Sequence, residues 1–171
     1  MLKKVKIRII TDRLTAKGSL FTPERDGALL PPDEAAWRTG EVQRTESVVE
    51  GSYHDDGHRV CIRYKESELS GMEGSTASIA FQKIEPTEIQ MLRDGSVKTA
   101  LSFAPHARRE CVYQTQIMPF DVCIYTRSVK NELEASGSLH LDYTVEIKGA
   151  EPEHTRLSLQ LLPCFDKPMG K

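Results

Sequence analysis

Apolar and polar residues alternate along most of this chain with the two-residue period of a half-buried β-strand. The clearest case is the run from Leu139 to Ile147, in which every second residue is apolar and the residues between are polar or charged. Runs near both ends of the sequence, 5–9 and 156–162, follow the same period. We expect about ten strands, at 5–9, 41–53, 58–67, 76–84, 87–93, 96–103, 110–117, 120–133, 139–148 and 156–162.

Short turns, such as Asp94–Gly95 and Glu134–Gly137, join these strands, and no long helix is predicted between them. Many short strands at regular spacing are typical of a sandwich or an up-and-down barrel. A sheet with one apolar face must bury that face, and closure also removes exposed edges, so a meander of this kind closes most easily into a barrel. The sequence therefore predicts an all-β fold, an up-and-down antiparallel β-barrel of about ten strands.

The turn at Asp56–Gly57 sets which side chains of the neighbouring strands face the interior. Asp-Gly is a strong signal for a two-residue hairpin loop, because a type I′ turn needs positive φ at both central residues. With this loop, Tyr53 lies opposite Val60, and the apolar residues as far as Tyr64 share one face. We expect that face to point inward.

The same register places Glu66 on the inner face, two residues beyond Tyr64. A buried carboxylate is costly unless it is paired, hydrogen-bonded or protonated. One interpretation makes Glu66 a ligand-anchoring group or a general acid or base. The other ends the strand near Tyr64 and leaves Glu66 solvated at the mouth of the barrel.

Other polar side chains that are candidates for the interior are Tyr64, Tyr143 and Arg127. The direction of Arg127 depends on a bulge that we expect before Gly137. If Arg127 and Glu66 both face inward, they pair with each other, or Arg127 binds a ligand carboxylate through its planar guanidinium.

The segment 11–40 interrupts the strand pattern with prolines and glycines, and a short helix is predicted at 32–38. It reads as a surface insertion, or as a lid over a barrel mouth with Trp37, the only tryptophan, as its plug. We expect one domain, 1–163, that contains this insertion, followed by a frayed tail, 164–171.

Composition excludes some function classes. The 171 residues carry a net charge of −2 with no basic face, and aromatic residues make up 6%, which supports neither nucleic-acid nor membrane-surface binding. Four widely spaced cysteines without a CxxC motif, in a chain without an apparent export signal, read as reduced thiols of a cytoplasmic protein.

We expect no metal and no cofactor. His54 and His58 are four residues apart, but on a hairpin this spacing does not bring them together as it would on a helix. The glycines of Gly71–Gly74 lack the following helix that phosphate-binding loops require, and no nucleophile motif occurs.

The run Tyr64–Thr76, with the sequence YKESELSGMEGST, resembles the signature segment of the bacterial YwiB-like β-barrel family, whose function is undetermined. The hairpin Leu92–Phe103 and the strand pair formed by Ile124–Arg127 and Gly137–Tyr143 also resemble segments of this family. The resemblance implies a calycin-like barrel, the architecture of lipocalins and fatty-acid-binding proteins, and it implies no substrate.

The resemblance covers residues 2–10 and 41–162, and two features depart from the family pattern. The segment 11–40 is longer than the family's usual first connection. Gln116–Pro119 replaces an expected proline-aromatic-glycine turn, which puts a shared ligand in doubt if that turn shapes a mouth.

We interpret the chain as a non-enzymatic barrel that binds a small, partly apolar or amphipathic molecule in its interior. One alternative is a protein–protein interaction barrel with a filled core. The other is a hydrolase or isomerase that uses Glu66 as acid or base. The candidate ligand-binding residues are Tyr64, Glu66, Arg127, Tyr143 and Trp37.

Overall fold

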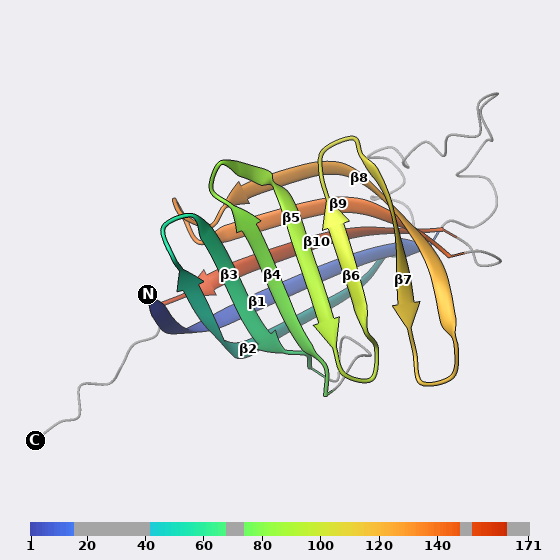
Figure 1. The fold of residues 1–171 in the computed structure, drawn as a ribbon, viewed down its shortest axis with the longest axis horizontal. Helices are drawn as coiled ribbons and strands as arrows, with labels where there is room; N and C mark the ends of the chain where they lie inside the picture. Colours follow the sequence, from blue (N-terminus) through green and yellow to red (C-terminus); the bar gives the residue numbers. More distant parts are fainter. Residues whose placement is uncertain (16–41, 68–73, 148–151, 164–171) are drawn as a thin grey trace, which may run out of the picture.

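The computed structural model describes residues 1–15, 42–67, 74–147 and 152–163. All the regular elements in these ranges are β-strands (Figure 1). Their bounds are β1 Leu2–Thr15, β2 Val42–Asp55, β3 Arg59–Lys65, β4 Thr76–Gln82, β5 Glu85–Asp94, β6 Thr99–Phe103, β7 Arg108–Gln114, β8 Pro119–Glu132, β9 Ser138–Ile147 and β10 Glu153–Leu162.

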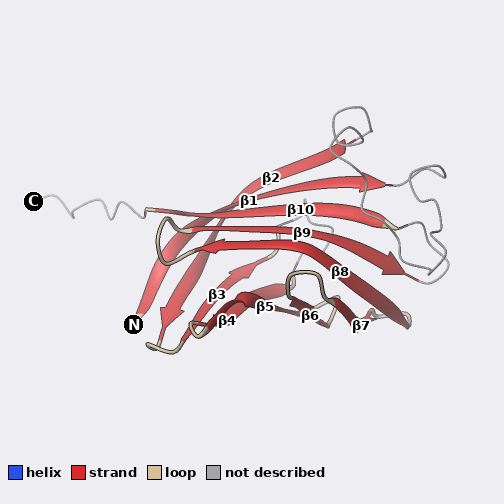
Figure 2. Ribbon diagram, turned by 90° about the horizontal axis from the view of Figure 1, so that it is seen from above, coloured by secondary structure: helices blue, strands red, loops and turns tan. Residues whose placement is uncertain are grey.

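The strands form one antiparallel sheet in the order β6-β5-β4-β3-β2-β1-β10-β9-β8-β7. The first and last strands are neighbours, paired from Lys6 with Leu162 to Thr15 with Glu153. The two ends of the sheet are β6 and β7, and the sheet curls so that they approach each other (Figure 2). This arrangement confirms the predicted all-β, up-and-down barrel, which is nearly closed.

The barrel closes at a seam between β6 and β7. The described residues of this seam share one isolated bridge, in which Lys98 and Gln114 exchange two backbone hydrogen bonds of 2.9 Å. Beyond the end of β6, the backbone N–H of His106 donates to the carbonyl of Thr126 on β8 at 2.8 Å. The seam is therefore held at its two ends, with no continuous ladder between β6 and β7 among the described residues.

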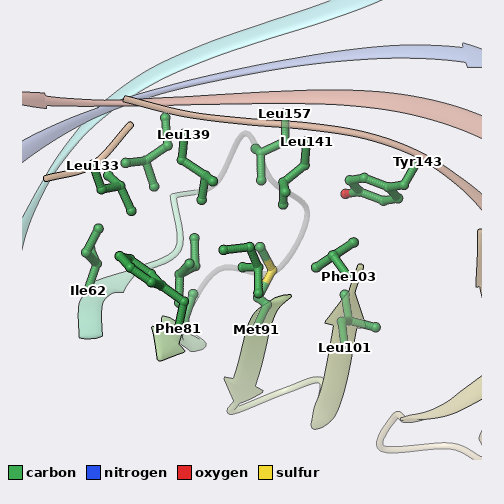
Figure 3. Packing of buried hydrophobic residues seen from close by; sticks show 14 of the residues in the cluster. Ile62, Phe81, Met91, Leu101, Phe103, Leu133, Leu139, Leu141, Tyr143 and Leu157 are labelled. Carbon is green, nitrogen blue, oxygen red and sulfur yellow. The ribbon is translucent and has the colours of Figure 1, made fainter. Parts of the chain in front are cut away.

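The alternation of side chains fills the interior. Inward residues from opposite walls, among them Ile62, Met91, Leu139 and Leu157, belong to one buried apolar cluster and face one another across the barrel (Figure 3). Full burial of such a side chain stabilises a fold by about 1.5–3 kcal/mol. The described part of the interior is thus a packed core over much of its length, not a hollow tube.

The central hairpin turns at Gly57–His58, so the register predicted around Asp56–Gly57 is wrong by two residues. Tyr53 pairs with Ile62, and Gly51 pairs with Tyr64. The carboxylate of Asp56 accepts hydrogen bonds from the backbone N–H groups of His58 and Arg59 at 2.8 and 2.7 Å, which fixes the turn one residue later than expected. Because the register is shifted by an even number of residues, the same side chains face inward as predicted, and Ile62 and Tyr64 are buried.

The first strand continues to Thr15, so residues 11–15 are not part of an insertion. Pairing on both sides extends it, because Leu14 pairs with Val42 of β2 and with His154 of β10. The remaining insertion, the predicted short helix and the tail 164–171 lie outside the described residues. The strand β7 ends at Gln114 rather than at Ile117.

Candidate functional site

A polar pocket lies at the end of the barrel where β3 and β5 end and β4 begins. Its volume is about 40 Å³, and its lining comes from β1, β2, β3, β5, β9 and β10 and the residues after β3. The charged lining residues are Arg13, Arg93 and Glu66, and the tyrosines are Tyr64 and Tyr143; threonine and serine hydroxyls of β1 and β2 complete the rim. A space of this size holds a few water molecules or one small polar group.

Glu66 is buried in this pocket and forms an ion pair with Arg93. The Nε of Arg93 donates to Oε1 of Glu66 at 3.0 Å, and the two side chains are 13% and 6% exposed. The backbone N–H of Glu66 bonds to the carbonyl of Ser75 at 2.8 Å, which extends the β3–β4 pairing beyond Lys65 and keeps Glu66 on the inner face. Glu66 is therefore not solvated at the barrel mouth, which was one of the two interpretations.

The partner of Glu66 is Arg93, which the sequence analysis did not select. Arg93 follows Ile89 and Met91 at the two-residue period of the inner face of β5, and both of these residues are fully buried. This two-residue period is the sequence signal that identifies Arg93 as an inward-facing residue. The contact itself joins β3 to β5 across β4, and no local pattern predicts such a pairing.

Tyr64 and Tyr143 enter the pocket from opposite walls and are 4% and 8% exposed. Burial raises the pKa of both phenols above the usual value, that of Tyr143 to about 12. Both hydroxyls therefore keep their protons at neutral pH and can donate hydrogen bonds. Neither hydroxyl has a hydrogen-bond partner among the described residues.

The ring of Tyr143 packs against Phe103, with ring centroids 4.7 Å apart and a tilted geometry (Figure 3). This contact fixes the aromatic ring while the hydroxyl stays available to the pocket. Tyr113 lies close enough to influence both Tyr143 and Arg93 electrostatically, and burial raises its pKa as well. The pocket wall therefore holds two protonated phenols, of Tyr64 and Tyr143, together with the guanidinium of Arg93.

The structure brings Tyr64, Glu66 and Tyr143 together, but it places Arg127 elsewhere. The β8–β9 register shifts between Thr126 and Ser128, so the bulge that precedes Gly137 lies at Arg127 itself. Arg127 does not line the pocket or pair with Glu66. Trp37 lies outside the described residues.

Arg127 lies near a second polar cluster, formed by Asp142, His154 and Arg156. Burial would raise the pKa of Asp142, but a hydrogen bond with His154 and the positive charges of Arg156 and Arg127 hold it below its usual value. In the part of the chain that the structure describes, no three His, Cys, Asp or Glu side chains gather as a metal site. The same residues include no helix that could span a membrane.

Comparison with known proteins places the chain in a family. Residues 35–159 match the family described as a domain of unknown function (DUF1934). The chain belongs to this family. The fold is similar to that of the ywiB protein from Bacillus subtilis, with a TM-score of 0.60 and 12% sequence identity over 95% of this chain and 96% of that one. No curated protein matches this chain.

These findings confirm the resemblance to YwiB-like barrels, and at 12% identity the structural likeness shows the fold alone. The DUF1934 match contains Tyr64, Glu66, Arg93 and Tyr143 and excludes β1, which carries Arg13. The four central residues of the pocket thus lie within the family region of this chain.

Proposed function

We propose that this DUF1934 protein binds a small molecule, without catalysing a reaction, through the pocket at the end of its barrel. The observation that supports this is that two buried tyrosines, Tyr64 and Tyr143, line a 40 Å³ pocket, and their hydroxyls form no hydrogen bond with another described residue. Ligand pockets are typically lined by a few polar groups of this kind, which orient the ligand through hydrogen bonds.

The packed core changes the expected position of the ligand. Buried apolar side chains, Met91 and Leu139 among them, occupy the described interior, so we do not place the ligand there. A polar group of the ligand fits the end pocket, where Ile9 and Leu157 supply an apolar part of the wall for the remainder. The ligand is therefore partly apolar, and its polar end is bound.

The ion pair with Arg93 accounts for the burial of Glu66, so no acid or base role is proposed for it. We place this binding in the cytoplasm. The free thiols of Cys61, Cys111 and Cys123, all half-buried, fit a reducing compartment.

A second candidate function is protein–protein contact through the tip of the β7–β8 hairpin. Ile117, Met118 and Phe120 are 92%, 51% and 40% exposed there. The hydroxyl of Thr115 accepts hydrogen bonds from the backbone N–H groups of Ile117 and Met118 at 3.3 and 3.2 Å, so the turn has a defined shape. Clustered exposed apolar residues of this kind are typical of interaction sites.

Native mass spectrometry of gently purified protein tests the proposed binding. We expect a bound small molecule that is released on denaturation. Ser47→Leu fills the pocket from β2 and should abolish this added mass, whereas Val48→Leu, on the outer face of the same strand, should retain it. If none of the three proteins ever carries a bound molecule, or if all three carry the same one, the pocket is not the binding site.

A further inference from the structure

The hydrogen-bonding groups that face the pocket are mostly donors. A guanidinium carries five N–H groups, and Arg93 uses its Nε to bind Glu66. The Nη groups of Arg93 have no hydrogen-bond partner among the described residues. Together with the protonated hydroxyls of Tyr64 and Tyr143, they present a set of donors to a space of about 40 Å³. A ligand that satisfies them must be an acceptor.

The charges that line the pocket favour an acceptor with one negative charge. Arg13 and Arg93 contribute two positive charges, and Glu66 contributes one negative charge. Arg13 also lies 3.6 Å from Glu153, but both side chains are more than a third exposed, so water and salt weaken that pair. One monoanion would neutralise the surplus charge of the pocket wall.

The shape and charge of an anion decide how well it matches the pocket. Two parallel N–H groups of a guanidinium match the two oxygens of a planar carboxylate. Phosphate is tetrahedral, so its oxygens match a planar guanidinium less well, and it carries up to two negative charges near neutral pH, which exceeds the surplus charge.

We infer that the pocket binds the carboxylate group of a small, partly apolar acid, held by the Nη groups of Arg93 and the hydroxyls of Tyr64 and Tyr143. This inference rests on the proposed function and names the chemical class of its ligand. The alkyl part of the acid lies along Ile9 and Leu157.

Titration of the full chain with butyrate, followed by two-dimensional amide NMR, tests this inference. Butyramide has nearly the same shape without the charge, and inorganic phosphate supplies a different anion. We expect butyrate to shift amide signals of the pocket strands β3, β5 and β9 and to bind at least tenfold more tightly than butyramide or phosphate. Equal binding of butyramide, or tighter binding of phosphate, would overturn the carboxylate assignment and leave small-molecule binding standing.

Variants then test the named donors. Tyr64→Phe and Tyr143→Phe each remove one hydroxyl at nearly constant volume, and each should weaken butyrate binding about 10- to 100-fold, as expected for a hydrogen bond to a charged group. Tyr53→Phe is the matched control, since Tyr53 is also packed against the core but does not line the pocket. Unchanged affinity in both pocket variants would refute the assignment of these hydroxyls.

The carboxylate assignment and the proposed small-molecule binding can fail separately, and the experiments give a different result in each case. If butyrate does not bind but native mass spectrometry finds another molecule that Ser47→Leu excludes, only the carboxylate assignment is wrong. If butyrate does not bind and no molecule is ever found, both are wrong.

Discussion

Replacing Glu66 with alanine leaves the guanidinium of Arg93 buried without its partner. The two groups are joined at 3.0 Å, and their side chains are 6% and 13% exposed. Loss of one member of a buried pair typically costs about 3–5 kcal/mol, because the remaining charge is neither hydrated nor compensated. Water in the adjoining pocket can solvate part of Arg93, so we expect a loss of about 3 kcal/mol.

Urea unfolding monitored by circular dichroism measures this loss, and a thermal scan should show a decrease in Tm of about 6–12 °C for a chain of this length. Glu66→Gln should cost less, since its amide oxygen can still accept from Nε of Arg93. The matched control is Glu46→Ala, which removes a half-exposed pair with Arg8 at 3.4 Å and should cost less than about 1 kcal/mol.

The double variant Glu66→Leu with Arg93→Met, measured beside the single variants Glu66→Leu and Arg93→Met, forms a double-mutant cycle. Replacing both charges by apolar groups of similar volume should restore most of the stability lost in Glu66→Ala, because no isolated charge remains. The reasoning is refuted if Glu66→Ala costs no more than Glu46→Ala, or if the double variant is as unstable as the sum of the two single losses.

Three further predictions concern other parts of the barrel. Burial raises the pKa of Tyr143 from 10.0 to about 12 in the folded state, so the folded state keeps this proton to higher pH than the unfolded state does. The contribution of Tyr143 to stability should be complete below pH 10 and be lost as the pH rises to 12. The unfolding free energy should therefore fall less steeply over this range in Tyr143→Phe than in the unmodified protein. Gly51→Ala should cost about 1–3 kcal/mol in urea unfolding, since its Cβ would lie 2.6 Å from the carbonyl oxygen of Arg63 and 2.7 Å from Cδ1 of Ile7; an unchanged midpoint would contradict this packing. Ile117→Ser, at a side chain that is 92% exposed, should change the unfolding free energy by less than about 0.5 kcal/mol, and a larger loss would show that the hairpin tip packs against the barrel.

The two-residue period predicts the fold and much of the pocket, because it depends on strand geometry and not on the exact partner. Tyr64, Glu66 and Tyr143 face inward as that period requires, even though the hairpin register is wrong by two residues. The error arose at Asp56, whose carboxylate bonds two backbone N–H groups and moves the turn by one residue. A side chain that competes for backbone donors is a local effect that the Asp-Gly rule does not include.

Arg93 and Arg127 show where the sequence is insufficient. A bulge changes which residues face inward, so the direction of Arg127 depends on the position of the bulge, and this position follows from the pairing of β8 with β9. Arg93 lies at an inward-facing position of the two-residue period, but its partner, Glu66, lies two strands away in the sheet. Contacts of this kind arise from the closed curvature of the whole sheet.

The seam between β6 and β7 also affects how the chain reaches and leaves its native state. Because β1 and β10 are laddered along most of their length, folding must bring together segments about as far apart in sequence as the chain allows, and such non-local pairing is slow. The weakest junction instead joins two strands that follow each other directly in sequence, with one bridge at Lys98 and Gln114. Spontaneous opening therefore starts in the middle of the polypeptide, and the strands nearest its two ends are among the last to separate.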